Sequence, residues 1–229
     1  MCGRFGLSRP EKLDLERFGV TEVPELRPRF NIAPSEDILV VRVRGGNRVA
    51  DLVKWGLVPH WARSATAVSV NARGDTAFEK ATFRDAMRLR RCLIPADLFY
   101  EWQEVPGQRH KQPFVVRLQS HEPFALGGIW DYWRPDNDAP GLATCAILTT
   151  DPNTLMTPIH DRMPVIVPMD KYRMWLDPRT PAPAIIDAMQ AYPSDEMEAW
   201  PISLRVNSPK EDDAQLLDPV EKQGLELFP

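Results

Sequence analysis

The 229-residue sequence is poor in two features that mark membrane and exported proteins, namely long apolar runs and cysteine. We expect no transmembrane helix, because no apolar run approaches the roughly 18 residues that a span requires. No apolar stretch near the N-terminus resembles a signal peptide. Cys2, Cys92 and Cys145 are odd in number, widely spaced and without a CxxC pair, which argues against a disulfide framework and a zinc finger. We therefore expect free thiols in the reducing cytoplasm.

The sequence also lacks an excess of positive charge. Its 28 Lys and Arg residues are outnumbered by 32 Asp and Glu residues, which gives a formal net charge of −4 at pH 7. This balance argues against a protein that coats nucleic acid by bulk electrostatics, and leaves open a local basic groove. The three cysteines and His160 lack the spacing of metal ligands, so we expect neither a metal nor another cofactor. What is present, 43% hydrophobic and 26% charged residues, is typical of a folded protein with a core.

Periodicity and end signals predict a few short helices. Residues 8–19 combine Ser8 and Glu11 at capping-box spacing with Gly19 as a stop, which predicts a first helix. Residues 78–91 have helical periodicity. On that second helix we expect Phe83, Ala86 and Met87 to face inward and Arg84, Arg88 and Arg91 to lie on another face, most simply as a solvated charge face. Two late helices are expected at 171–176 and 182–192.

Strand-like runs separated by turn residues make up most of the remaining chain. Gly45-Gly46-Asn47, between two β-rich runs in 37–59, predicts a hairpin. Further strands are expected at 92–102, 112–118, 123–133, 142–150, 163–168 and 200–206. This pattern predicts one α+β domain over residues 1–229, with a mainly antiparallel, barrel-like β core and peripheral helices. We expect the acidic tail, from about residue 211 to 229, to be partly loose.

Three segments place polar side chains in or beside strand-like runs. Glu101 lies between two aromatic residues, where an unpaired buried carboxylate is costly. His160 begins a His-Asp-Arg cluster just before an apolar strand, and Asn71 and Arg73 would point the same way on a short strand. Each has an ordinary structural alternative: an arginine partner for the glutamate, a hydrogen bond to the neighbouring aspartate for the histidine, and a simple turn for the other two.

Cys2 is the residue that favours a functional interpretation. A small side chain at position 2 permits removal of the initiator methionine, so we expect the mature chain to begin with Cys2, a 1,2-aminothiol. An α-amine has a pKa near 7.7–8.0, against about 10.4 for lysine, so its neutral form is hundreds of times more populated near pH 7. Such an amine attacks an aldehyde to give a Schiff base, and the thiol then closes a five-membered thiazolidine ring. An adjacent acid–base group, Glu101 or His160, would shuttle the protons.

Six segments together resemble the SOS-response-associated peptidase (SRAP) family. They are Met-Cys-Gly-Arg-Phe at 1–5, Trp-Gly-Leu-Val-Pro at 55–59, Asn-Ala-Arg at 71–73, Arg-Arg-Cys-Leu-Ile-Pro-Ala at 90–96, Phe-Tyr-Glu-Trp at 99–102 and Ile-His-Asp-Arg-Met-Pro at 159–164. The resemblance runs in order over nearly the whole chain. The chain departs from the usual family pattern at Leu98 and over Gly74-Asp75-Thr76.

The resemblance implies a fold, an activity and a set of site residues. It implies the SRAP fold and a thiazolidine crosslink between the mature N-terminal cysteine and an abasic site in single-stranded DNA, which shields the lesion. It implies that the catalytic residues are Cys2, Asn71 for positioning, Glu101 for Schiff-base formation and His160 for opening the sugar. It implies DNA contacts by Arg4, Arg73 and Arg162 to phosphates, by Pro34 and Trp61 to bases, and by Thr149. A few phosphate contacts in one groove are compatible with a net charge of −4.

Two other classes of function remain open from the sequence. A cysteine peptidase or amidase would use Cys2 as nucleophile, His160 as base and Glu101 as orienting carboxylate. Its mildest form is removal of Met1 by the protein itself, which we expect alongside the crosslinking activity. A plain single-strand binding module would leave the cysteine incidental. We expect an essentially single-turnover protein that is monomeric, cytoplasmic and nucleoid-associated when it acts on DNA, with replication-fork proteins as possible partners and no membrane contact.

Overall fold

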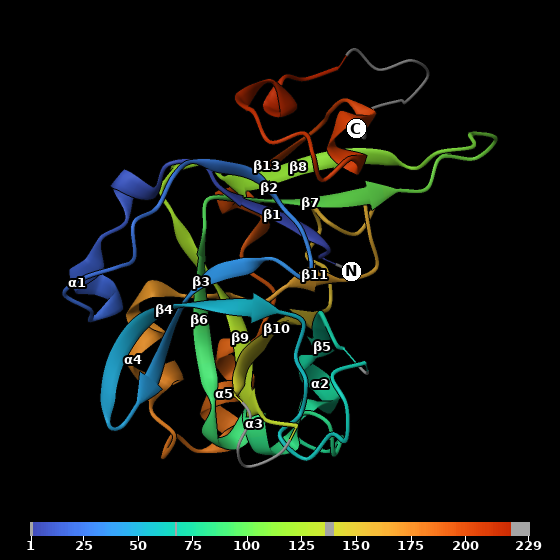
Figure 1. Cartoon of the computed structure of the whole chain (residues 1–229). Coiled ribbons are helices and arrows are strands. Elements are labelled where there is room, and N and C mark those ends of the chain that lie inside the picture. Colours follow the sequence, from blue (N-terminus) through green and yellow to red (C-terminus); the bar gives the residue numbers. More distant parts are fainter. Residues whose placement is uncertain (1, 67, 136–139, 221–229) are drawn as a thin grey trace.

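The structure is a computed structural model that describes residues 2–66, 68–135 and 140–220 (Figure 1). Its strands are β1 (Arg4–Leu7), β2 (Arg29–Ile32), β3 (Asp37–Arg44), β4 (Asn47–Trp55), β5 (Asn71–Arg73), β6 (Arg91–Ala96), β7 (Leu98–Gln103), β8 (Gln112–Leu118), β9 (Phe124–Trp133), β10 (Leu142–Thr150), β11 (Met163–Pro164), β12 (Ile166–Val167) and β13 (Met197–Pro201). Its α-helices are α1 (Leu15–Phe18), α2 (Gly74–Ala77), α3 (Arg84–Leu89), α4 (Tyr172–Leu176) and α5 (Ala182–Ala188). Short 3-10 helices are η1 (Pro10–Lys12), η2 (Met169–Lys171), η3 (Ser194–Glu196), η4 (Leu204–Asn207) and η5 (Ala214–Leu217).

Five strands form a closed barrel in the order β10, β4, β3, β6, β9 and back to β10. The barrel closes through β9, where Gly128 lies opposite Cys92 of β6 on one side and Ile147 of β10 on the other. Strand β10 runs parallel to β4 and β5, and the other strand pairings in the described ranges are antiparallel. The predicted α+β fold with a mainly antiparallel, barrel-like core is confirmed.

A second, antiparallel sheet, in the order β13, β8, β7, β1 and β2, lies over one end of the barrel (Figure 1). Between the two lies a core cluster that includes Cys2, Phe5, Trp55 and Phe99. The rings of Phe5 and Trp55 meet edge to face with centroids 5.3 Å apart, a favourable geometry for buried aromatic pairs. The start of the chain is therefore held by core packing, unlike the frayed end of many domains.

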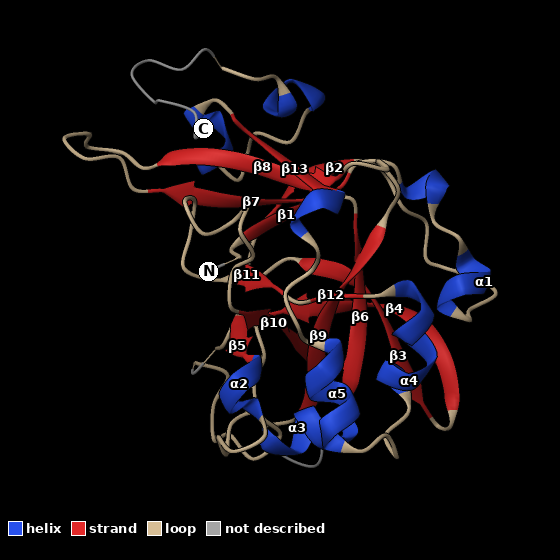
Figure 2. Cartoon of the chain, turned by 180° about the vertical axis from the view of Figure 1, so that it is seen from behind, coloured by secondary structure: helices blue, strands red, loops and turns tan. Residues whose placement is uncertain are grey.

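Helices α3, α4 and α5 cover the outside of the barrel on the face seen in Figure 2. Their buried residues include Met87, Trp175 and Ile185, which join a second core cluster with barrel residues. The Trp175 indole Nε1 donates to the carbonyl of Cys92 at 2.9 Å, which fixes α4 against β6. No helix in the described part of the chain is both long and apolar enough to cross a membrane.

The predicted hairpin is confirmed as β3 and β4. Its two turn residues, Gly45 and Gly46, have φ of 58° and 84°. Positive φ at both central positions belongs to the turn type that matches the twist of paired strands, and glycine adopts it at no steric cost.

The helix predicted over residues 8–19 is wrong in its first half. The Ser8 hydroxyl donates to the Asp97 carboxylate at 2.8 Å, and the amides of Ser8 and Arg9 also bond to Asp97, so no capping box forms. The α-helix starts only after Asp14, whose side chain accepts from Arg17 N, and it ends as predicted at Gly19 with φ 68°. The carboxylate of Asp97, which is distant in the sequence, binds the Ser8 groups that the predicted capping box would use.

Arg91 does not lie on an exposed helix face. It belongs to β6 and is 4% exposed, and its guanidinium donates to four carbonyl oxygens, those of Met87, Arg88, Trp175 and Asp177. Phe83, Ala86 and Met87 are buried as predicted. A cation enters the interior here because carbonyl oxygens satisfy its donors.

Three strand predictions need smaller corrections. The run 92–102 is divided between β6 and β7 at Asp97, the run 163–168 forms two two-residue strands, and the run 200–206 leaves the strand after Pro201 and enters η4. Part of the acidic tail packs on β2, because the Asp212 carboxylate accepts from the amide of Asn31 at 2.9 Å and Leu216 is fully buried. Residues 221–229 of the predicted loose tail lie outside the described residues.

Candidate functional site

Cys2 is fully buried where the barrel meets the second sheet. Its carbonyl oxygen accepts a hydrogen bond from Asn71 Nδ2 at 2.9 Å, and its Sγ points to the carbonyl of Arg4 at 3.8 Å. Asn71 begins β5, which pairs in parallel with β10 of the barrel, so the barrel itself holds the backbone of residue 2. Met1 lies outside the described residues.

Glu101 is brought to the same place by the pairing of β1 with β7. Arg4 lies opposite Tyr100 and Phe5 opposite Phe99, so the chain before β1 continues alongside Glu101. The Glu101 side chain is 1% exposed, which confirms the prediction of a carboxyl group inside a buried strand.

His160 completes the group from the loop that leads into β11. Its Nε2 lies 3.9 Å from Glu101 Oε2. Its Nδ1 accepts from the backbone amide of Arg162 at 3.0 Å and lies 2.9 Å from Asp161 Oδ1. The Nε2 edge of the ring therefore faces Glu101, while the Nδ1 edge is held by the backbone of residue 162 and by Asp161.

Burial sets the protonation of all three titratable groups. Burial raises the pKa of Glu101 to about 7 and lowers the pKa of His160 below its usual value. Burial, with the Glu101 charge as a smaller cause, raises the pKa of the Cys2 thiol well above its usual value. Near pH 7 the site therefore holds a neutral thiol, a neutral imidazole and a carboxyl group poised to give or take a proton.

Arg73 and Arg162 lie beside this group and already have carboxylate partners. Arg73 forms a two-point contact with Asp75, Nη2 to Oδ2 at 2.7 Å and Nε to Oδ1 at 3.3 Å. Arg162 donates from Nη1 to Asp151 and from Nη2 to the carbonyl of Thr149 at 2.8 Å. The hydroxyl of Thr149 is buried and has no hydrogen-bond partner among the described residues.

Arg4, two residues after Cys2, also has protein partners. Its Nη1 donates to Asn31 Oδ1 at 3.0 Å and to the carbonyl of Val206 at 2.8 Å. Trp61 is 55% exposed and Pro34 is partly exposed, and both belong to loops at the ends of barrel strands. The prediction of DNA contacts by these residues stays a prediction.

A cleft of about 680 Å³ opens beside His160. It lies between the β7–β8 hairpin and the 152–161 loop, and is lined by Trp102, Glu104, Lys111, Pro152, Thr157, Pro158, Ile159, His160 and Asp161. Solvent therefore reaches the imidazole although Cys2 and Glu101 are buried. No sequence pattern indicates this cleft, because its walls are two loops that only the fold brings together.

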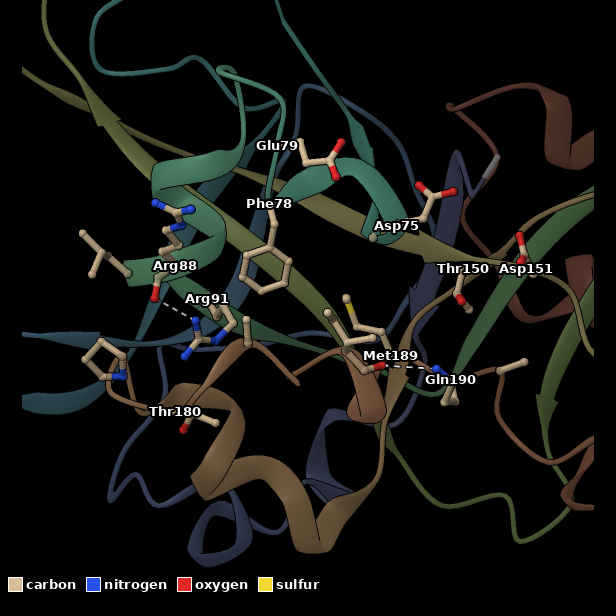
Figure 3. A pocket seen from close by; sticks show the side chains of 16 residues that line it. Asp75, Phe78, Glu79, Arg88, Arg91, Thr150, Asp151, Thr180, Met189 and Gln190 are labelled. Atoms are coloured by element: carbon tan, nitrogen blue, oxygen red, sulfur yellow. Dashed lines mark hydrogen bonds between the residues drawn. The ribbon is translucent and has the colours of Figure 1, made fainter. Parts of the chain in front are cut away.

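A second pocket, of about 600 Å³, lies over α2, α3 and α5 (Figure 3). Phe78 stands in the middle of it, with Asp75 and Asp151 toward one side and Arg88 and Arg91 toward the other (Figure 3). The same two carboxylates contact the arginines described above, so this pocket borders the candidate site. The sequence analysis does not identify these carboxylates as part of the site, although Asp75 lies only two residues after Arg73, a spacing at which the two side chains can pair.

Cys2 is buried where the barrel meets the second sheet, with Asn71, Glu101 and His160 around it, so the fold gathers a thiol, an amide, a carboxyl group and an imidazole in one place. The described ranges contain no group of three or more His, Cys, Asp or Glu side chains placed to hold a metal ion. The three cysteines are free and buried. The arrangement suits acid–base chemistry around a single thiol and backbone nitrogen.

Comparison with known proteins identifies the family. The sequence profile described as SOS response associated peptidase (SRAP) matches residues 1–209, and the chain belongs to this family. The chain is 39% identical to "Abasic site processing protein YoaM" of Bacillus subtilis, over 95% of this chain and 98% of the relative. It is 27% identical to "Abasic site processing protein HMCES" of Mus musculus, over 96% of this chain and 76% of the relative. A crystal structure of a protein from Bacteroides thetaiotaomicron shares the fold, with a TM-score of 0.84 and 24% identity over 96% of this chain and all of that one.

Proposed function

We propose that this protein recognises abasic sites in single-stranded DNA and captures them covalently through Cys2, once Met1 has been removed. The observation that carries the proposal is the placement of Cys2, whose backbone is held by Asn71 beside a buried Glu101 and a neighbouring His160. The names of the relatives, abasic site processing proteins, support the choice of substrate. The resulting crosslink shields the lesion.

The first chemical step is Schiff-base formation. His160 moves a proton on the closed sugar so that the ring opens to the aldehyde, and the free α-amine of Cys2 attacks the aldehyde carbon. The carbinolamine that forms loses its oxygen as water, which requires a proton donor. A Glu101 carboxyl group with a pKa of about 7 is suited to deliver that proton near neutral pH.

The second step closes the ring. The Cys2 sulfur attacks the imine carbon, the carbon–nitrogen double bond becomes a single bond, and the thiol proton ends on nitrogen by way of Glu101. The net reaction joins aldehyde and aminothiol and releases one water molecule. Because burial raises the pKa of the thiol, the sulfur needs a base to accept its proton, and in the proposed sequence its attack follows that of the amine.

The DNA strand would run over the cluster of Arg73, Arg162 and Arg4, with Trp61 and Pro34 against the neighbouring bases. Guanidinium groups suit phosphate oxygens, and an exposed indole suits an unstacked base, at about 1–3 kcal/mol per stacked base. With so few phosphate contacts, binding to undamaged DNA is expected to be weak and sensitive to salt.

The protonation of the Cys2 thiol favours this capture reaction over a cysteine peptidase. A peptidase cysteine needs a lowered pKa, usually from a direct histidine contact. Here burial and the nearby Glu101 raise the pKa of the Cys2 thiol. Turnover separates the two functions, because a peptidase releases product repeatedly and a crosslinker stops at one adduct per chain.

The test is a denaturing gel of protein mixed with a single-stranded oligonucleotide that contains one abasic site. We expect a shifted band for the wild type, and none for Cys2→Ala or for a chain with its α-amine acetylated. Cys92→Ala is the matched control, because Cys92 is equally buried but lies in the barrel wall, and its band is expected to persist. A band of equal strength with Cys2→Ala would refute the proposed function.

A further inference from the structure

The side chain of Arg162 is almost fully buried, and its guanidinium group lies beside two aspartates. The side chain is 7% exposed, and its Nη1 donates to Asp151 and lies 3.8 Å from Asp75 Oδ2. Its Nε is buried and has no hydrogen-bond partner among the described residues. The Asp151 side chain is 87% exposed, so the Nη1 edge of the arginine is the edge nearest the surface, and a carboxylate already occupies it.

Arg73 has the same arrangement in an exposed setting. Its side chain is 52% exposed and that of Asp75 is 44% exposed, and the two groups meet through two parallel hydrogen bonds. This fork is the geometry in which arginine binds a phosphate group. Asp75 thus contacts both arginines, and Asp151 contacts the buried one.

Both arginines are tied to the residues around Cys2. Arg73 lies two positions after Asn71 on β5, and Arg162 lies two positions after His160. Thr149 is the strand partner of Arg73, and its carbonyl accepts from Arg162 Nη2. A DNA strand that presents a sugar to Cys2 therefore passes the four charged groups together.

We propose that Asp75 and Asp151 occupy the phosphate positions of Arg73 and Arg162 and that a DNA strand must displace them, which makes the two aspartates specificity-determining residues against undamaged DNA. This inference rests on the proposed function and deepens it. The Arg73–Asp75 pair is exposed and contributes little, and the Asp151 side chain is 87% exposed, so a bound strand can displace both carboxylates towards solvent. The displaced carboxylates nevertheless remain within a screening length of the phosphates and repel them.

The consequence is that undamaged DNA is bound only reversibly and weakly, whereas DNA with an abasic site is held covalently. An undamaged strand gains too little from two neutralised arginines to stay bound. A strand with an abasic site is held by a covalent bond, which the weak electrostatic equilibrium does not affect. The negative charge near the groove thus selects for damage without any direct contact to the lesion.

The test measures binding of a fluorescein-labelled, undamaged single-stranded oligonucleotide by anisotropy at several salt concentrations. We expect Asp75→Asn and Asp151→Asn each to bind roughly three- to tenfold more tightly than the wild type. The plot of log affinity against log salt should steepen by up to about 0.7 per carboxylate removed, because the freed arginine now releases counterions.

Asp187→Asn is the matched control. Asp187 is a 70% exposed carboxylate that pairs with Lys171 at 2.6 Å in the helical layer, and its variant should bind as the wild type does. Asp151→Ser is a second variant at the exposed position and should follow Asp151→Asn. Thermal unfolding checks that each variant is folded.

Unchanged or weaker binding by the folded Asp75 and Asp151 variants, with an equal or shallower salt slope, would overturn the inference, since the aspartates would then only orient the arginines. Crosslinking of abasic DNA by the wild type, measured in parallel, separates this failure from failure of the proposed function. If the wild type forms an adduct and the variants gain no affinity, only the inference falls. If no adduct forms but the variants gain affinity, only the proposed chemistry falls.

Discussion

A carboxyl group at residue 101 lies inside a strand with almost no exposed surface, and this has a cost that can be measured. Burial raises the pKa of Glu101 from 4.5 to about 7. Below pH 4.5 the group is protonated in both the folded and the unfolded chain, so its ionisation does not affect stability. As the pH rises from 4.5 through 7, the unfolded chain ionises first, and the free energy of unfolding falls.

Glu101→Gln removes this ionisation. We expect the free energy of unfolding of the variant, relative to that of the wild type, to be higher at pH 8 than at pH 4.5 by on the order of 2–3 kcal/mol. Urea unfolding of both proteins at pH 4.5, 6 and 8 measures the difference. Glu16→Gln, at an exposed position on α1, should show no such trend. The same Glu101 variant should form the DNA crosslink more slowly. The role given to this residue would be contradicted if the stability difference between variant and wild type were the same at pH 4.5 and pH 8 and the variant formed the crosslink at the full rate.

At the scale of single elements, the closure of the barrel depends on Gly128 in β9. A Cβ added there would lie 2.8 Å from Ile94 Cδ1, 2.9 Å from Cys92 Sγ and 3.1 Å from the carbonyl oxygen of Ala146. Two of the three contacts come from packed barrel side chains and one from backbone, so little can move aside. The close approach of three strands here requires glycine.

Gly128→Ala is expected to destabilise the protein by about 1–3 kcal/mol through overpacking. Gly45→Asn is the control, since Gly45 has φ 58° with no atom within 4 Å of an added Cβ, and asparagine followed by glycine is the favoured pair in this turn. We expect that variant to stay within about 0.5 kcal/mol of the wild type in denaturant unfolding. Equal stability of the two variants would mean that the barrel is packed less tightly at β9 than the distances indicate.

Elements with strong local signals were predictable from the sequence, and those decided by distant contacts were not. The run 112–118 coincides with β8 and the run 142–150 with β10, because alternating or continuous apolar residues end at turn residues on both sides. The break between β6 and β7 falls at Asp97, and the same residue removes the Ser8 cap, because its carboxylate binds Ser8 and Arg9, which lie 89 and 88 positions earlier. Arg91 was misplaced because its four carbonyl partners come together only in the fold.

The candidate site was predictable to a similar degree. Cys2, Glu101 and His160 stand out because each residue type is unusual in its local pattern, whereas the role of Asn71 is implied by the family resemblance. The structure brings the four residues together. The pairing of Asp151 with Arg162 was not predictable, since nothing in either segment indicates that the other is near.

At the scale of the whole molecule, the segment after β13 covers the outer face of the second sheet. It does so through buried Val206 and Leu216 and through Asn31, whose Nδ2 donates to the carbonyls of Val206, Ser208 and Glu211 at 2.8–3.2 Å. Asn31 also accepts from Arg4, so one buried amide connects the C-terminal segment to the start of the chain. The site at Cys2 is thereby supported by the far end of the described sequence.

Asn31→Ala is expected to destabilise the protein by about 2–4 kcal/mol, because it removes a fully buried amide and takes a donor from the carbonyls of Ser208 and Glu211. It should also make residues 203–211 sensitive to limited proteolysis at temperatures where the wild type resists. Gln108→Ala, at an exposed position on the β7–β8 hairpin, should change neither property. A wild-type cleavage pattern in the Asn31 variant would show that the segment is held by other contacts.

The central claim, that nitrogen and sulfur of one residue both bind one sugar carbon, is tested most directly by intact mass spectrometry of the protein incubated with abasic-site DNA. The predicted product has the mass of the chain without Met1 plus the oligonucleotide, less one water, and borohydride leaves that mass unchanged because a thiazolidine has no imine to reduce. A gain of two hydrogens on borohydride treatment would show that the product is only a Schiff base. A product that retains Met1 would contradict the account altogether.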